Sequence, residues 1–209
     1  MIEDRKHIAI AGAGVMGSSM AQLFAANGYQ VILYDISEEA VIKSRDLIRT
    51  DQEAAIQAGE LTEEERKEIE EHICSTCEKE CFKEADFVIE AIIEKMEVKH
   101  SFWREVSALV PDRAILTSNT SGLSLTQIAE AVKMPERFCG MHWLNPPHIC
   151  PLVEVIKGEK TSEKTAEVVC QIAEDIGHFP VMLKKEVPGF LVNRFQFAVL
   201  REAMSLVEA

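Results

Sequence analysis

Short apolar runs alternate with stretches of helical periodicity along most of the chain. The runs have the length of buried strands and cover residues 7–11, 30–34, 86–92, 114–118, 137–142, 152–156 and 179–184. Apolar residues recur at helical spacing between them, in residues 15–27, 37–57, 96–109, 124–133 and 162–176. Strands that alternate with helices predict an α/β fold, doubly wound and of the Rossmann type, with a mostly parallel sheet.

Polar residues mark where two helices begin. Ser37 is a good N-cap, and the acids Glu38 and Glu39 after it favour the positive end of the helix dipole. Thr62 and Glu65 have the spacing of a capping box, so we expect a further helix to open there.

The last segment, from Pro188 onward, has apolar residues around most of its helical circumference. A helix of this kind is buried on several sides in a folded protein. We therefore expect a Rossmann domain in residues 1–187, followed in 188–209 by the first helix of a truncated all-α C-terminal domain. Another subunit that covers the helix is the alternative.

The charge balance narrows the possible partners. The formal net charge of −13 argues against nucleic acid and against an anionic membrane surface. No apolar run reaches transmembrane length and the N-terminus has no signal-peptide pattern, so we expect a cytoplasmic protein. A phosphate-bearing ligand must then be held by backbone amides or by a few placed cations.

Six cysteines are expected to be reduced thiols in that location. Cys74, Cys77 and Cys81, with His72 beside them, raise zinc as an alternative. Their spacing matches no standard pair of zinc knuckles, so we expect no metal site.

A glycine array follows the first predicted strand and opens the first predicted helix. Gly12, Gly14 and Gly17 suit a tight turn, a close approach of pyrophosphate and close packing of helix on strand. The N–H groups at the start of the helix, at Val15 and Met16, would bind the phosphates.

An acid ends the second predicted strand, 23 residues after Gly12. Asp35 would accept hydrogen bonds from the adenosine ribose and repel a 2′-phosphate, which favours NAD over NADP. FAD uses the same fingerprint and is the main competitor. A plain glycine turn with a helix-capping acid is the structural alternative.

One histidine and one glutamate lie in two apolar runs that a proline-rich loop joins. His142 and Glu154 could meet as a general base and its orienting carboxylate, because imidazole titrates near neutral pH. From these two residues alone, a surface histidine and a solvated glutamate would be the favoured interpretation.

Seven motifs in order along the chain resemble the NAD-binding domain of the 3-hydroxyacyl-CoA dehydrogenase family, and 3-hydroxybutyryl-CoA dehydrogenases in particular. They are GAGVMG (12–17), YD (34–35), EAIIE (90–94), SNTS (118–121), MHWLNPP (141–147), PLVEV (151–155) and PGFLVNR (188–194). The resemblance implies oxidation of a 3-hydroxyacyl-CoA to the 3-ketoacyl-CoA with NAD, or the reverse. It also implies a homodimer formed through the C-terminal helical domain of the full-length protein.

The resemblance assigns roles to individual residues. His142 would be the general base, oriented by Glu154, while Ser121 and Asn193 would hydrogen-bond the substrate oxygen. On the cofactor, Asn119 would contact the nicotinamide side, and Glu90 and Lys95 would lie near the nicotinamide ribose.

The segment after the second strand does not decide between two classes of substrate. Basic residues there would meet the phosphates of CoA, and the chain offers Lys43, Arg45 and Arg49, followed by a stretch rich in acids. A free 3-hydroxy acid, as in gulonate or carnitine dehydrogenases, is the second candidate substrate. A non-catalytic dinucleotide-binding module is a third possibility. We expect the 209-residue chain alone to bind NAD with weak or no turnover.

Overall fold

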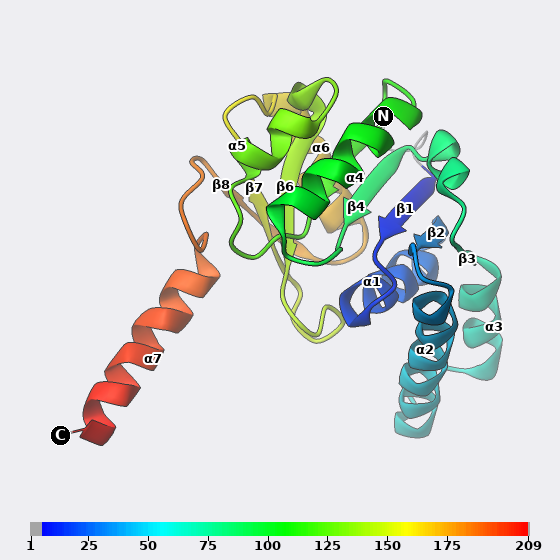
Figure 1. Cartoon of the computed structure of the whole chain (residues 1–209). Coiled ribbons are helices and arrows are strands. Elements are labelled where there is room, and N and C mark those ends of the chain that lie inside the picture. The colour runs from blue at the N-terminus through cyan, green and yellow to red at the C-terminus, as the bar shows by residue number, and fades with distance from the viewer. Residues whose placement is uncertain (1–5, 209) are drawn as a thin grey trace.

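A computed structural model describes residues 6–208 and contains one eight-stranded sheet (Figure 1). The strand order is β3-β2-β1-β4-β5-β6-β7-β8, and all neighbours are parallel except β6 and β7. The strands are β1 (His7–Ala11), β2 (Gln30–Tyr34), β3 (Ile73–Thr76), β4 (Phe87–Glu90), β5 (Ile115–Ser118), β6 (Phe138–Trp143), β7 (Leu152–Ile156) and β8 (Phe179–Leu183). This topology confirms the predicted doubly wound α/β fold.

Helices cover both faces of the sheet. The apolar side chains of α1 and α6 pack into one core, to which α2 and α3 also contribute, whereas α4 and α5 pack into a second core on the other face. The α-helices are α1 (Val15–Ala26), α2 (Glu38–Ala58), α3 (Glu63–Glu71), α4 (Met96–Leu109), α5 (Leu125–Ile128), α6 (Glu163–Asp175) and α7 (Val192–Glu208).

The predicted helix starts are confirmed. The Ser37 hydroxyl accepts a hydrogen bond from the Ala40 N–H at the start of α2. At α3 the Glu65 N–H donates to the Thr62 hydroxyl, and the Thr62 N–H donates to the Glu65 carboxylate, which completes the capping box.

Two elements differ from the sequence-based expectation. The helix predicted over 124–133 is a short α5 that continues as a 3₁₀ turn, Ala129–Ala131. The pattern of apolar runs did not predict strand β3, because it is a short edge strand that includes Ser75 and Thr76 and is only partly buried. Its pairing with β2 supplies a strand that its own sequence pattern does not indicate.

The three clustered cysteines lie on and after this edge strand. Cys74 is exposed, Cys77 and Cys81 are partly buried, and all the cysteines are free thiols. Burial raises the pKa of the Cys81 thiol to about 12. Within residues 6–208, no group of three or more histidine, cysteine, aspartate or glutamate side chains could hold a metal ion.

Helix α7 leaves the body of the molecule, and none of its described residues is buried (Figure 1). Large apolar side chains such as Phe195 and Phe197 are more than half exposed. The sequence pattern predicts that the apolar side chains of α7 are buried, but the described residues do not cover them. The expected division of the chain after residue 187 stays a prediction. No helix in the described part of the chain has both the length and the apolar character needed to cross a membrane.

The packing of Phe24 generates a stability prediction. This α1 side chain is fully buried and makes edge contacts with Tyr29 and Trp143. Phe24→Ala should lower the free energy of unfolding by about 3–5 kcal/mol, because it removes buried apolar surface and leaves a cavity. Urea unfolding measures the change. Phe197→Ala on α7 is the matched control, since that ring is 56% exposed, and an equal loss there would contradict the prediction.

Candidate active site

The glycine loop between β1 and α1 has three positions with different steric demands. Gly12 has φ +107°, and a Cβ there would lie 2.4 Å from the Ala91 carbonyl oxygen. A Cβ on Gly17 would lie 1.8 Å from the Gly12 carbonyl oxygen, so α1 approaches the loop more closely than any side chain would allow. A Cβ on Gly14 would meet no atom of the described residues within 4 Å. The loop is therefore packed on its inner side and open at Gly14.

Helix α1 begins at this open position. Its N-cap is Gly14, no side chain of the described residues caps it, and its first turn contains no acid. The N–H groups of Val15 and Met16 lie in that first turn, where the helix dipole is positive. This end of α1 is suited to an anionic group such as a diphosphate.

Asp35 lies beside the glycine loop, directly after β2. One carboxylate oxygen accepts from the Ala13 N–H at 2.9 Å and the other accepts from the Ser37 N–H at 3.0 Å. The carboxylate thus holds the loop and the start of α2 together, a role that the sequence did not reveal.

A cleft of about 440 Å³ opens next to this carboxylate. Gly12, Gly14 and Asp35 form one side of it, and the apolar side chains of Ile36, Ile93 and Phe102 are among the others that line it. A flat apolar base and a ribose fit this combination of apolar surface and carboxylate. The glycine loop, the N-terminal end of α1 and the cleft together fit the adenosine and diphosphate parts of a dinucleotide.

The predicted histidine and glutamate face each other across two neighbouring strands. His142 on β6 and Glu154 on β7 are direct partners in the antiparallel register. His142 Nδ1 lies 2.7 Å from a Glu154 carboxylate oxygen. The side chains are 4% and 0% exposed, so the interpretation as a surface histidine and a solvated glutamate is wrong.

The second oxygen of Glu154 binds the start of α7. It accepts hydrogen bonds from the N–H groups of Leu191 at 2.7 Å and Val192 at 3.0 Å. Burial alone would raise the pKa of the Glu154 carboxyl, but the bonds from His142, Val192 and Leu191 hold that pKa below its ordinary value of 4.5. Glu154 is accordingly an anion near neutral pH and an acceptor for the imidazole N–H.

The other ring nitrogen of His142 faces Ser121. The distance from Nε2 to the Ser121 hydroxyl oxygen is 3.2 Å. If Nδ1–H donates to Glu154, Nε2 is an acceptor and the Ser121 O–H donates to it. The Asn193 side-chain amide donates to the Ser121 carbonyl oxygen at 3.1 Å. All four residues of the predicted catalytic set therefore meet in one place, although they come from four separate segments.

Among the described residues, the side chains of the three predicted to lie near the nicotinamide, Asn119, Glu90 and Lys95, do not bond to one another as those of the catalytic set do. Asn119 uses its side-chain oxygen to accept from the Trp143 N–H at 2.8 Å. Glu90 is fully buried, forms an ion pair with Lys99 and accepts from the Ser118 hydroxyl at 2.7 Å. Lys95 is exposed at the N-cap of α4. Their contacts with a cofactor stay predictions.

Sequence reasoning missed Glu94, four residues after Glu90 in the same EAIIE motif. One of its oxygens accepts from the N–H groups of Ser121 at 3.0 Å and Gly122 at 3.2 Å, and also from the Thr120 hydroxyl. Its other oxygen lies 3.3 Å from the Lys99 ammonium. Glu94 thus fixes the backbone that carries the Ser121 hydroxyl, and only the repeated acid in the motif could have indicated it.

Comparison with known proteins agrees with this geometry. The family model described as "3-hydroxyacyl-CoA dehydrogenase, NAD binding domain" matches residues 7–187. The chain belongs to the 3-hydroxyacyl-CoA dehydrogenase family. The resemblance drawn from the sequence motifs is confirmed, and the expected cofactor, NAD, is that of the family.

Relatives of this dehydrogenase domain are longer than the chain. A 5-formyl-3-hydroxy-2-methylpyridine 4-carboxylate 5-dehydrogenase of Mesorhizobium japonicum is 37% identical over 97% of this chain and 65% of its own length. The 3-hydroxyadipyl-CoA dehydrogenase of Escherichia coli is 35% identical over 96% of this chain and 42% of its own length. The chain therefore spans less than two thirds of these curated relatives.

A solved structure matches the fold closely. The (S)-3-hydroxybutyryl-CoA dehydrogenase of Ralstonia eutropha superposes with a TM-score of 0.94 at 32% identity, covering 98% of this chain and 72% of that one.

Asp35 provides a test of cofactor selection in this dehydrogenase domain. Asp35→Asn should raise the Kd for NAD about tenfold, because a charged acceptor for the ribose hydroxyls is lost. The same change should narrow the preference for NAD over NADP, since the repulsion of a 2′-phosphate is gone. Calorimetric titration with both nucleotides measures this. Asp175→Asn at the end of α6 is the control. If the ratio of the Kd values for NAD and NADP were unchanged in Asp35→Asn, the assignment of Asp35 to the adenosine ribose would be refuted.

The lowered pKa of Glu154 predicts how stability depends on pH. The folded state binds this proton more weakly than the unfolded state, so the stabilisation is present above pH 4.5 and is lost as the pH falls through the folded-state pKa. Glu154→Gln should therefore flatten the fall in unfolding free energy between pH 6 and pH 3, which urea unfolding at each pH would show. Glu130→Gln, at an exposed position, should leave the profile as in the wild type. Equal slopes in all three proteins would contradict the prediction.

Proposed function

We propose that the protein oxidises the 3-hydroxy group of an acyl-CoA, such as 3-hydroxybutyryl-CoA, to a ketone with NAD, or catalyses the reverse reaction. The observation that carries the proposal is the hydrogen-bonded series from Glu154 through His142 to Ser121. It starts at a buried anion and ends at an exposed serine, so a proton acceptor is available where a substrate can reach it. The family supports an oxidoreductase of this type.

His142 is the general base of the proposed reaction. Its Nε2 takes the proton of the substrate hydroxyl, while Nδ1–H remains bonded to Glu154. The carboxylate keeps the ring in the required tautomer and stabilises the imidazolium that forms. When bound, NAD supplies the hydride acceptor. In the reverse direction the imidazolium returns the proton to the developing alkoxide.

Ser121 and Asn193 hold the substrate oxygen in this proposal. The Ser121 hydroxyl is already within hydrogen-bond distance of the base, and the Asn193 amide reaches the backbone of the same residue. Both can donate to an oxygen on which negative charge develops. Glu94 keeps the Ser121 backbone in place through two N–H bonds.

The charge of the α2–α3 hairpin favours a second candidate, a free 3-hydroxy acid. Residues 38–71 carry twelve acidic and five basic side chains. Lys43, Arg49 and Arg66 each pair with acids of their own helix. A surface of this kind attracts the phosphates of CoA poorly. The relative from Mesorhizobium japonicum is named for a pyridine carboxylate and not for a CoA ester, which supports a substrate without CoA.

Association through the C-terminal region is also proposed. Helix α7 exposes several large apolar side chains, among them Phe195 and Leu206, at 66% and 70%. Apolar area of this extent supports the expectation that further helices or a second subunit cover it.

A substrate panel separates the two candidates. The protein is assayed with NADH and acetoacetyl-CoA, and with NAD and free 3-hydroxy acids. Faster turnover of the CoA ester supports the leading proposal. If only the free acids are oxidised, the second candidate replaces it.

Substitution of the base tests the chemistry itself. His142→Ala should lower the turnover of whichever substrate the panel identifies by at least about a hundredfold, the usual contribution of a general base. The affinity for NAD should stay unchanged, because His142 is remote from the glycine loop in sequence and is not one of the residues that line its cleft. His72→Ala, at the end of α3, is the control. Full activity of His142→Ala would refute His142 as the general base, whereas a wild-type protein that turns over neither substrate would favour the non-catalytic alternative.

A further inference from the structure

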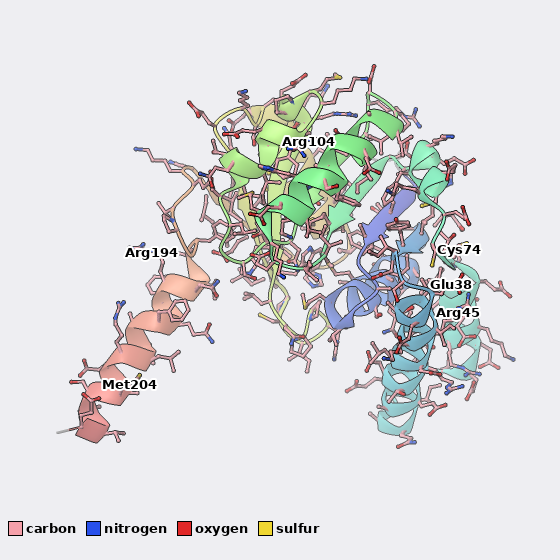
Figure 2. The ribbon with its side chains drawn as sticks, in the orientation of Figure 1. Glu38, Arg45, Cys74, Arg104, Arg194 and Met204 are labelled. Atoms are coloured by element: carbon pink, nitrogen blue, oxygen red, sulfur yellow. The ribbon has the colours of Figure 1, made fainter. Side chains whose placement is uncertain are left out.

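A few contacts in and just before its first turn hold helix α7 in position. None of its described residues is buried, yet Asn193 in its first turn reaches the Ser121 backbone at 3.1 Å. Figure 2 shows Arg194 where the helix begins and Met204 far out along it, away from the sheet. The segment between β8 and α7 must therefore determine where the Asn193 side chain lies.

Glu186 in that segment binds the start of α5. One carboxylate oxygen accepts from the Leu125 N–H at 2.6 Å. The other accepts from the Thr126 N–H at 3.1 Å and from the Thr126 hydroxyl at 2.5 Å. Three donors on a half-buried carboxylate make a strong attachment, because hydrogen bonds to an ionised acceptor are stronger than neutral ones. The α5 helix follows the Ser121 loop, so Glu186 ties the segment to the loop that carries the proposed substrate contact.

Two further contacts complete the attachment. The Phe190 side chain is 2% exposed, and its ring centroid lies 5.5 Å from that of His142. Glu154 then receives the N–H groups of Leu191 and Val192. Glu186 lies upstream of both contacts and fixes the backbone from which they start.

We infer that Glu186 is a positioning residue for the Ser121–Asn193 pair, an inference that rests on the proposed function of that pair. By holding the segment between β8 and α7 against α5, Glu186 maintains the hydrogen bonds of the Leu191 and Val192 N–H groups to Glu154. It also maintains the hydrogen bond of the Asn193 side chain to Ser121. Among the described residues, none of the Glu186 contacts involves His142 or the glycine loop, so Glu186 acts on the site through the start of α5 and the position of α7.

Hydrogen exchange and NMR test the positioning step without turnover. In Glu186→Gln the amides of Leu191 and Val192 should exchange about tenfold faster, because the segment between β8 and α7 has lost its charged anchor. The side-chain amide resonances of Asn193 should shift toward those of a solvated asparagine. Glu186→Asp should recover part of both effects. Thr126→Val, which removes one donor and leaves Glu186 in place, should give a smaller effect of the same kind.

A second carboxylate cap provides the matched control. Glu65 accepts from the N–H and hydroxyl of Thr62 at the start of α3, in the same manner but far along the chain from α7. Glu65→Gln should leave the Leu191, Val192 and Asn193 signals as in the wild type. Wild-type exchange and wild-type Asn193 resonances in a folded Glu186→Gln variant would overturn the inference.

Turnover then separates this inference from the proposed function. In the active full-length protein, Glu186→Gln should lower kcat about tenfold and leave the KM for NAD unchanged. Unchanged kcat would overturn the catalytic part of the inference. Absence of dehydrogenase activity in the wild type would instead refute the proposed function, while the exchange data would still decide whether Glu186 positions α7.

Discussion

The buried carboxylate of Glu154 links the proposed catalytic base on β6 to the start of α7. One oxygen is bonded to the imidazole of His142, and the other accepts two backbone N–H groups at the start of α7. An ionised carboxylate without partners would be very costly at this depth, so the three donors are a condition for keeping the charge there. The same bonds give the imidazole its orientation and give α7 its point of attachment. The geometry of the proposed base and the start of the C-terminal helix thus both depend on this side chain.

The loop around Ser121 shows the same use of carboxylates as backbone acceptors. Glu94 binds the N–H groups of Ser121 and Gly122 in the loop, and Glu186 binds those of Leu125 and Thr126 at the start of α5, directly after it. Loops carry few apolar contacts of their own, so hydrogen bonds to charged acceptors are an effective way to hold them. The protein has a net charge of −13, and the carboxylates of Glu94 and Glu186 are two of its negative charges that backbone N–H groups stabilise.

The excess of acids also affects how an anionic cofactor and an anionic substrate can bind. The proposed site of the NAD diphosphate needs no cation, because the open face of Gly14 and the uncapped end of α1 provide N–H groups and a positive dipole. A CoA substrate would carry its phosphates past the acidic α2–α3 hairpin, where Lys43, Arg49 and Arg66 are engaged with acids of their own helices. Electrostatics therefore bears on whether the substrate carries the phosphates of CoA.

Local patterns in the sequence determined the elements and the cofactor. Periodicity indicated most strands and helices, and the glycine spacing with Asp35 indicated a dinucleotide, because these signals depend on residues that are near one another in the chain. The catalytic set came from resemblance, since His142 and Glu154 alone would have been taken for surface residues. Only the tertiary structure decided that β7 runs antiparallel to β6, which makes these two residues direct cross-strand partners. It also decided the roles of Glu94 and Glu186, whose acceptor bonds cross 26 or more residues of sequence, a separation over which no local pattern carries information.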